Sequence, residues 1–478
     1  MILNFLSYSM ITNPSSPASR YIRAAIADSY DRLIAPSIER EIRNDLFDSA
    51  SEGAIKLFSD NLKHLLMQAP LKGKTVLGFD PGYVNGCKTA VVDKTGKVLD
   101  TAVIYPTTKS QYKTEEAKKV ISGLILKYNV DVVAIGNGTA SKESEIFIAG
   151  LLKELGTDCR YIVVSEAGAS VYSASKLAAE EFPQFDVMQR SAVSIARRLQ
   201  DPLAELVKID PKSIGVGQYQ HDMKQARLDD ALAGVVEDCV NAVGVDVNTA
   251  SYSLMSYISG INSTCAKNIV KYREENGEFC SRSQILKVPR LGAKAYEQCA
   301  GFLRVPQSEE ILDNTGVHPE SYDAARRLLR MFGYTEEDVA CGRLSELSAK
   351  VRDKGTDEVC RELEIGAPTL NDIIGELEKP GRDVRDTLPP PVLRDDVLGI
   401  EDLKPDMVLT GTVRNVIDFG AFVDIGVHQD GLVHISQISD KYIKHPSEVL
   451  SVGDVVNVRV LSVDVKKKRI SLSMKNIR

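Results

Sequence analysis

The spacing of apolar residues divides the chain into helical and β-rich stretches. Residues 16–69 carry apolar positions three and four apart, which predicts helices. From Thr75 the period shortens into β-rich runs, and helical segments near 113–128 and 141–155 separate the later ones. Three closely spaced strands followed by alternating helices and strands predict an α/β sheet of mixed direction.

The second half of the chain is helical until a proline-rich stretch. The apolar pattern predicts helices over 188–245 and helical hairpins over 251–305 and 306–378. Three consecutive prolines at 389–391 then mark an extended, semi-rigid linker. Beyond it, alternating positions punctuated by glycine predict a small β-barrel over 404–478.

A length of 478 residues is too great for a single core, so we predict several domains. The fold class is multidomain and combines α/β, all-α and β parts. The boundaries that we predict are a helical segment at 1–70, an α/β domain at 71–250, a pair of helical hairpins at 251–305, a further helical domain at 306–380, a linker at 381–403 and the barrel at 404–478.

Charge is unevenly distributed among these domains. The chain has 59 Lys and Arg against 66 Asp and Glu, a formal net charge of −7, which disfavours coating of nucleic acid by bulk charge. Residues 404–478 nevertheless hold 11 basic against 8 acidic residues, and 251–305 hold 8 against 4. Two basic modules in an acidic chain predict local surfaces for nucleic acid.

Cysteine usage and hydropathy indicate the compartment. The eight cysteines show no C-x-x-C spacing and do not cluster with histidine, which fits reduced thiols better than a disulfide framework or a zinc site. No run approaches the roughly 20 apolar residues of a membrane span. The first residues, MILNFLSYSMITNP, lack the basic region and cleavage site of a signal peptide. We therefore expect a cytoplasmic protein with no membrane partner.

Aromatic and basic residues gather in the predicted barrel. Phe419 and Phe422 flank Gly420 in one strand, and either they belong to the core or they form an exposed platform on which bases stack. Residues 404–478 resemble the RNA-binding domain of ribosomal protein S1, an OB-fold. That resemblance implies a binding face formed by Phe419, Phe422, His434, Asp464 and Arg469.

Two turns in the hairpin region precede helices. Such a turn lets backbone N–H groups face a phosphate without reading a base. The turns resemble helix-hairpin-helix motifs, although Asn262 replaces the second glycine of the first one, and an ordinary glycine-capped hairpin is the alternative. The residues singled out for binding duplex DNA are Gly260, Ile261, Asn262 and Lys267 in the first hairpin and Leu291, Gly292 and Lys294 in the second.

Carboxylates in the α/β domain suggest metal chemistry. Asp80 ends the first strand, in VLGFDPG, while Glu166 and Asp238 are the downstream candidates for catalysis and metal binding. Two-metal phosphodiester chemistry needs several carboxylates around cations about 3.5–4 Å apart. Residues 75–245 resemble the YqgF domain, a relative of ribonuclease H and Holliday-junction resolvases. Asn137 stands where the resolvase pattern has an acid, so the metal site is incomplete. The alternative is a turn-forming Asp80 and a solvated Asp238.

The order of the modules resembles the Tex family of bacterial transcription accessory proteins across about 20–478. The stretches that carry this resemblance include DPGYVNGCKTAVVD, AIGNGTASKESE and DFGAFVDIGVHQDGLVHIS. Members of the family have a further N-terminal helical region, so we expect an N-terminally truncated member.

The resemblance implies a scaffold near RNA polymerase that holds RNA on the barrel and duplex DNA at the hairpins, with no cofactor required. Two alternatives stay open. One is a structure-selective nuclease of the YqgF-like domain that depends on Mg²⁺ or Mn²⁺. The other is a ribosome- or translation-associated RNA-binding protein.

Overall fold

The computed structural model describes residues 1–107, 110–381, 383–394, 403–417, 419–427, 429–439, 441–451, 453–465, 467 and 469–475. The chain forms two compact units. One unit combines residues 1–60 with 217–231, and the other combines 61–216 with 232–478.

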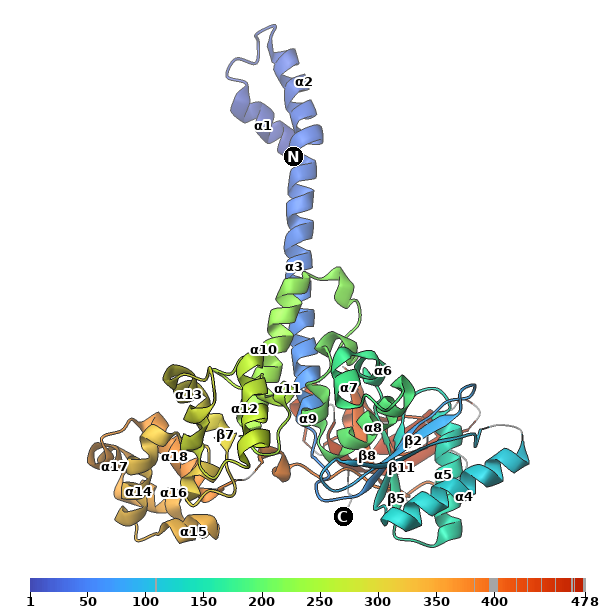
Figure 1. The fold of residues 1–478 in the computed structure, drawn as a ribbon. Coiled ribbons are helices and arrows are strands. Elements are labelled where there is room, and N and C mark those ends of the chain that lie inside the picture. The colour runs from blue at the N-terminus through green and yellow to red at the C-terminus, as the bar shows by residue number, and fades with distance from the viewer. Residues whose placement is uncertain are drawn as a thin grey trace. The chain divides into compact units, whose positions relative to one another are not determined.

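The first unit is helical (Figure 1). It contains α1 (Ile2–Met10), α2 (Ser19–Ser29), a π-helical turn (Tyr30–Ile34) and most of α3 (Ala35–Leu66). Pro36 does not interrupt this helical run, because the π-helical turn directly before it accommodates the missing N–H. Within the unit, Lys224 and Arg227 form ion pairs of 2.9 and 3.0 Å with Asp48 and Glu52 of α3.

The second unit begins with a five-stranded sheet in the order β3-β2-β1-β4-β5. The three strands β1 to β3 pair antiparallel, whereas β4 pairs parallel with both β1 and β5. The mixed sheet predicted from the sequence is therefore confirmed. The strands are β1 (Val76–Asp80), β2 (Cys87–Val92), β3 (Val98–Ile104), β4 (Val132–Gly136) and β5 (Arg160–Val164).

Helices cover both faces of this sheet. The helices α4 (Gln111–Tyr128) and α5 (Ser141–Leu155) bury one face, and α8 (Val187–Gln200) covers the other. Gly78 of β1 is needed for this packing, because a Cβ there would overlap the Ala192 carbonyl oxygen of α8. Side chains alternate between the two faces, so Asp80, two residues after Gly78, lies on the α8 face.

The far edge of the sheet is met by the linker. Tyr161 of β5 and Arg394 exchange both backbone hydrogen bonds, each at 2.8 Å. Three further helices complete this part of the unit: α6 (Ala169–Ala174), α7 (Lys176–Glu181) and α9 (Pro202–Leu206). The helix α10 (Gln225–Val243) begins in the first unit and continues into the second from residue 232.

The next two modules are helical and share a buried arginine. Arg282 is 1% exposed, and its guanidinium donates to the backbone carbonyls of four residues and to the Tyr322 hydroxyl. Its own backbone N–H donates to the Asp313 carboxylate at 2.7 Å. The helices here are α11 (Tyr252–Met255), α12 (Ser263–Asn276), α13 (Ala293–Cys299), α14 (Tyr322–Met331), α15 (Glu336–Ala340), α16 (Leu347–Lys354), α17 (Thr356–Leu363) and α18 (Ala367–Glu378). A short parallel pair, β6 (Val245–Asp246) and β7 (Leu303–Arg304), accompanies them.

A second buried arginine ties the end of the helical region to the α/β domain. Arg385 is 2% exposed and pairs at 2.7 Å with both Asp383 and Asp201, the residue that caps α9. Lys72 adds a contact of 2.9 Å to Asp383. Although burial alone would raise the pKa of Asp383, the hydrogen bonds from Arg385 and Lys72 lower it to about 2.

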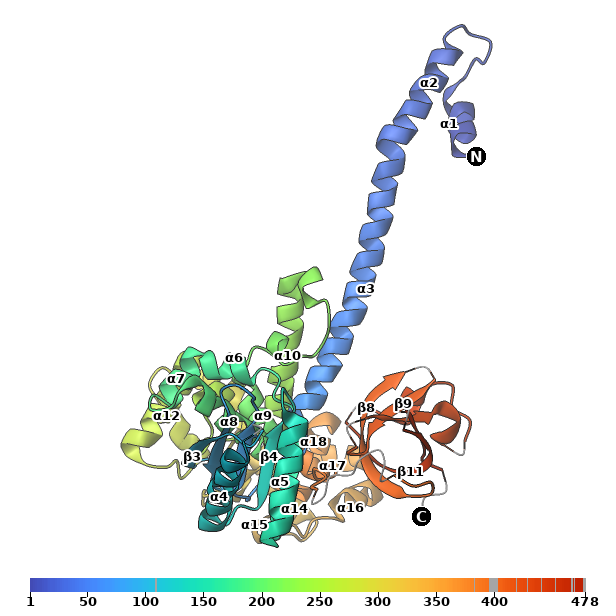
Figure 2. The ribbon, with the colours of Figure 1, turned by 90° about the vertical axis from the view of Figure 1, so that its right-hand side faces the viewer.

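The last module is a closed five-stranded barrel in the order β10-β12-β11-β8-β9 (Figure 2), as the sequence predicts. Its core consists of valine, isoleucine and leucine side chains that alternate with outward residues along the strands. The strands are β8 (Val408–Ile417), β9 (Gly420–Asp424), β10 (Gly431–His434), β11 (Val455–Asp464) and β12 (Arg469–Ser473). Among the helices that the structure describes, none has the length and apolar character needed to cross a membrane.

We expect Arg282→Met to lower the free energy of unfolding by about 3–5 kcal/mol, because four buried carbonyls and the Tyr322 hydroxyl lose their donor and the buried Asp313 carboxylate loses a neighbouring positive charge. The exposed Lys287 supplies a control, and Lys287→Met should change stability by less than about 0.5 kcal/mol. Urea denaturation of the full chain measures both. Equal losses in the two variants would contradict the assignment of Arg282.

The lowered pKa of Asp383 also predicts a pH dependence. Its contribution is complete above the ordinary carboxylate pKa of 3.8 and is lost as the pH falls towards 2. We expect Asp383→Asn to cost about 2 kcal/mol at pH 6 and close to nothing near pH 2. Denaturation across this pH range tests it, with Asp386→Asn, a more exposed carboxylate 3.5 Å from Lys72, as the control. A pH-independent difference would be inconsistent with this prediction.

Candidate nucleic-acid interfaces

The barrel presents an aromatic residue on its outer surface. Ala421 and Val423 of β9 are buried inside, so Phe422 between them points outward and is half-buried. Phe419, just before β9, is 53% exposed. Gly420 separates the two rings, and a Cβ there would overlap the Val433 carbonyl oxygen of the neighbouring strand. The two phenylalanines are therefore at the surface and are not part of the core.

Strand register brings further predicted residues to the same face. Phe422 lies opposite Leu432, which in turn lies opposite Ser471. Because side chains two residues apart share a face, His434 and Arg469 join this group. Both are exposed. The structure thus brings an aromatic ring, an imidazole and a guanidinium onto one outer face of the barrel.

Asp464 lies on the same outer face as Arg469, because the two exposed residues are directly opposite each other across the β11–β12 hairpin. Its carboxylate also accepts a hydrogen bond of 3.0 Å from the Lys467 backbone N–H, which shapes the hairpin.

The first hairpin turn has the backbone that the sequence suggests. Gly260 has a φ of +81°, in the left-handed region that favours glycine, and Ile261 is buried. Asn262 caps α12, since its side-chain oxygen accepts a hydrogen bond of 2.9 Å from the Cys265 N–H. Asn262 therefore occupies one backbone donor that a glycine at this position would leave free for a phosphate.

The second turn has a residue other than glycine in the left-handed region. The left-handed residue is Arg290, with a φ of +67°, while Gly292 has an ordinary φ of −78°. Arg290 precedes the buried Leu291 as Gly260 precedes Ile261, and this parallel was the signal that could have identified it. Gly292 has open space around its missing Cβ. A glycine there leaves the backbone open to an approaching phosphate.

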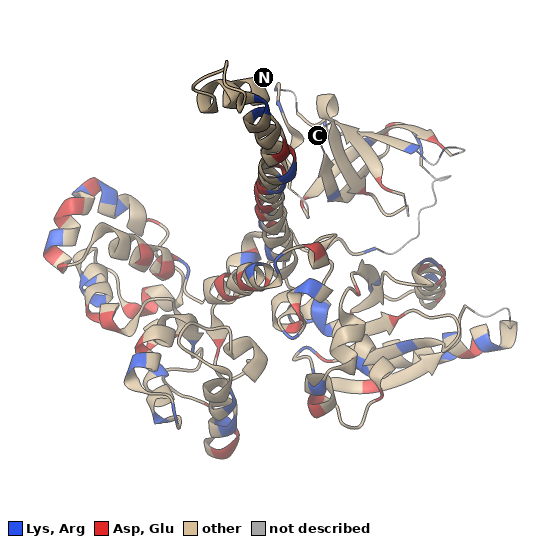
Figure 3. Cartoon of the chain, turned by 90° about the horizontal axis from the view of Figure 1, so that it is seen from above, with Lys and Arg blue, Asp and Glu red and all other residues tan. Residues whose placement is uncertain are grey.

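Lysines accompany both turns. Lys267 and Lys294 are exposed, and the Lys267 ammonium lies 5.0 Å from the centre of the Tyr252 ring. Lys and Arg alternate with Asp and Glu along the described helices (Figure 3). Any phosphate contact at the hairpins therefore depends on individual lysines at the turns and not on a continuous basic surface.

The α/β domain brings two of the three predicted carboxylates together. Asp80 is the last residue of β1 and lies on the α8 face. Glu166 comes after β5, and its carboxylate lies so close to Gly138 that a Cβ on that glycine would overlap it. Burial raises the pKa of Asp80, opposed by a hydrogen bond with Ser191 and by the charge of Lys88. Burial also raises the pKa of Glu166, and the negative charge of Asp80 adds to that rise.

The third predicted carboxylate lies elsewhere. Asp238 is exposed on α10, whereas the helix that packs against β1 is α8, which contains no Asp or Glu. Within the described residues, no three His, Cys, Asp or Glu side chains are grouped so as to hold a metal ion. Asn137 has a structural contact instead, accepting a hydrogen bond of 3.0 Å from the Glu166 backbone N–H. The three-carboxylate set that the sequence suggested is thus not assembled in this part of the chain.

Two basic residues that sequence reasoning missed flank the carboxylates. Lys88 lies directly opposite Asp80 on β2, is 7% exposed and donates to the Gly86 carbonyl at 2.7 Å. Arg198 of α8 is 4% exposed. It donates to the carbonyls on either side of Glu166, those of Ser165 and Ala167, at 2.6 and 2.9 Å. Only the pairing of β2 with β1 and the packing of α8 reveal this proximity.

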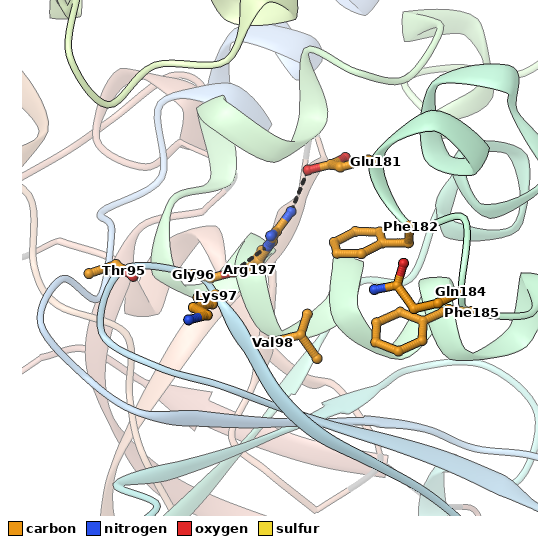
Figure 4. Close-up of a pocket in the computed structure, with 9 residues that line it drawn as sticks. All are labelled: Thr95, Gly96, Lys97, Val98, Glu181, Phe182, Gln184, Phe185 and Arg197. Carbon is orange, nitrogen blue, oxygen red and sulfur yellow. Dashed lines mark hydrogen bonds and ion pairs between the residues drawn. The ribbon is translucent and has the colours of Figure 1, made fainter. Parts of the chain in front are cut away.

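A pocket of about 440 Å³ lies at the β2–β3 turn (Figure 4). Arg197 crosses it, pairing with Glu181 at 2.6 Å and donating to the Gly96 carbonyl at 2.7 Å. The rings of Phe182 and Phe185 stack beside it, 5.5 Å apart. Neither Asp80 nor Glu166 lines this pocket, which is therefore separate from the Asp80 site.

Comparison with known families assigns each module. Residues 74–200 match the Tex protein YqgF-like domain, 240–304 a helix-hairpin-helix motif, 310–385 an HHH domain and 402–475 the S1 RNA-binding domain. The chain is 51% identical over 461 residues to the transcriptional accessory protein Tex of Neisseria gonorrhoeae, covering 96% of this chain and 59% of that protein. The chain belongs to the Tex family.

Other relatives of this Tex chain show the same relation. It is 55% identical over 470 residues to the uncharacterized protein YdcI of Bacillus subtilis, covering 98% of this chain and 65% of that protein. It is 50% identical over 462 residues to the protein YhgF of Escherichia coli, with coverage of 96% and 59%. The Tex chain therefore spans about three-fifths of the length of these curated relatives. The match at 310–385 gives an HHH identity to a region that the sequence predicted only as helical.

The outer face of the Tex barrel generates the first binding prediction. We expect Phe422→Ala to weaken binding of single-stranded RNA by about 5- to 150-fold, because stacking on one aromatic ring contributes about 1–3 kcal/mol per base. Arg469→Ala should weaken it as well, with a reduced salt dependence. Fluorescence anisotropy with a labelled oligonucleotide measures the affinity. Phe47→Ala, which removes a 46% exposed ring from α3, is the matched control. If Phe422→Ala binds the oligonucleotide as tightly as wild type, the assignment of this face as the RNA-binding surface is wrong.

Proposed function

We propose that this Tex chain is a nucleic-acid-binding scaffold that acts with the transcription machinery and does not itself cleave its ligand. It holds RNA or another single strand on the barrel and duplex phosphates at the hairpins. The observation that carries the proposal is the joint placement of Phe422, His434 and Arg469 on one outer face of an S1 barrel.

The barrel face suits single strands of varied sequence. A half-buried ring such as Phe422 is held in place by its own strand yet leaves part of its π face to a base. Every base has such a face, so stacking tolerates many sequences. The exposed Arg469 supplies a charge for the backbone phosphates. An unpaired strand is the ligand that offers exposed base faces and backbone phosphates at once.

The hairpins suit duplex phosphates. Their turns present backbone N–H groups and exposed lysines, and neither element reads a base edge. We propose DNA as the duplex, bound without sequence preference through a small number of phosphate contacts.

We propose no catalytic role for the YqgF-like domain and no required cofactor. The domain has the ribonuclease H-like fold, in which nuclease chemistry occurs. Phosphodiester cleavage with two metals needs several convergent carboxylates. Here Asp80 and Glu166 are accompanied by Lys88 and Arg198. This composition supports a scaffold over a nuclease.

The proposed partner and compartment rest on a relative's name and on the state of the cysteines. The Neisseria relative is named a transcriptional accessory protein, and on this basis we propose RNA polymerase as the partner. Co-purification of a tagged chain with polymerase, and not with ribosomes, tests this proposal. All eight cysteines are free, which fits a reducing compartment, so we place the protein in the cytoplasm.

The duplex site has a test of its own. We expect Lys267→Ala combined with Lys294→Ala to weaken duplex DNA binding and to reduce the slope of log affinity against log salt by about 1.8, since each phosphate contact contributes about 0.9. Titrations between 50 and 200 mM salt, roughly the range over which this effect is large, measure the slope. Lys354→Ala, which removes a lysine already paired with Glu362 at 2.9 Å, is the control. A slope unchanged in the double variant would contradict the proposal.

A further inference from the structure

Two buried cations accompany the two carboxylates at the Asp80 site, and a further buried carboxylate, Glu205, acts on one of these cations, Arg198. Asp80 and Glu166 supply two negative charges, and Lys88 and Arg198 supply two positive charges. Both cations are more than nine-tenths buried, at 7% and 4% exposure. Burying a charge without a partner is costly, so buried charges are almost always compensated. This site achieves compensation from its own side chains.

The residues present do not fit the divalent metal that the fold implies. A magnesium or manganese site relies on carboxylates and other oxygens. The α8 positions that face the ends of the strands are Ser191, which hydrogen-bonds with Asp80, then Ile195, which lies against Gly136, and then Arg198. This face of the helix offers one hydroxyl, one hydrocarbon side chain and one positive charge. A third carboxylate is thus replaced by a group that repels a cation.

Lys88 acts from the opposite side. Direct pairing of residues 80 and 88 across β1 and β2 places the two side chains on the same face of the sheet. Burial raises the pKa of Asp80 overall, and the positive charge of Lys88 opposes that rise. Its hydrogen bond to the Gly86 carbonyl holds the ammonium in the β1–β2 loop region. A divalent ion on Asp80 would share one buried face of the sheet with this positive charge, and repulsion between cations is strong where water screens it poorly.

We propose that Lys88 and Arg198 are built-in counter-cations that take the place of a divalent metal, and that Lys88 is the residue that excludes the metal from Asp80. Arg198 has a positioning role, because it donates hydrogen bonds to the backbone carbonyls on both sides of Glu166. The proposal goes beyond the scaffold function. Nucleic-acid binding at the barrel and hairpins does not depend on it, so either can fail alone.

The test is a Mn²⁺ titration of the full chain, followed by electron paramagnetic resonance of the free ion. Wild type and Asp80→Asn should bind Mn²⁺ equally, because no site depends on Asp80. Lys88→Met should gain one Mn²⁺ site at least about tenfold tighter than any in wild type, and Lys88→Met combined with Asp80→Asn should lose it again. Lys94→Met, which neutralises an exposed lysine after β2, should behave as wild type.

Several results would overturn the proposal. A Mn²⁺ site in wild type that disappears in Asp80→Asn would show that Lys88 does not exclude the metal. A folded Lys88→Met variant with no gained site would show that Lys88 is not the excluding group. Lys88→Arg keeps the positive charge and should remain without a site, so a gain there would also contradict the proposal. If Lys88→Met does not fold, Lys88→Gln removes the same charge with a polar side chain and should gain the Asp80-dependent site, so a folded Lys88→Gln variant without that site would overturn the proposal.

Discussion

A guanidinium group that leaves water must have its N–H donors met by oxygen atoms, and this requirement governs how the modules of the chain are joined. Arg282 meets it with carbonyls and a hydroxyl drawn from the segment that begins the second helical module. Arg385 meets it with carboxylates from its own turn and from the start of α9. Each of these two hydrogen-bond networks forms only when two segments that are distant in the sequence are both folded. The buried arginines thus couple the folding of neighbouring modules.

In the α/β domain the requirement is met in part, because Arg198 makes hydrogen bonds with its Nη1 while its buried Nε and Nη2 have no partner among the described residues. Arg198 draws the Ser165 and Ala167 carbonyls towards α8 and so fixes the turn that carries Glu166. The fold keeps the strand order and the acid at the end of β1, yet the helix beside them carries hydroxyl, hydrocarbon and cation. On our proposal, the charges at the centre of this domain are balanced internally and the fold serves packing. A fold does not by itself determine the chemistry of its site.

Sequence reasoning reached the elements and modules but not all of the site. Short β-rich runs predicted the sheet, alternation predicted the barrel, and the outward placement of Phe422 follows from that alternation. Asp238 is a carboxylate on α10, but which helix packs on β1 depends on a close approach at Gly78 that no local pattern encodes. Lys88 and Arg198 escaped notice because their burial results from strand pairing and helix packing. Arg290 escaped because its left-handed backbone is rare outside glycine.

The hydrogen-bond exchange between Tyr161 and Arg394 has a consequence for the behaviour of the protein in a crowded cell. The open side of β5 is a row of donors and acceptors that a strand from another molecule could use, and such edges promote domain swapping and aggregation. The linker occupies part of that row with a single residue. Proline lacks an N–H, so the three prolines at 389–391 cannot extend the contact into a ladder. The linker to the barrel therefore covers part of the exposed edge of the sheet, and its prolines prevent it from forming a new strand with an open edge of its own.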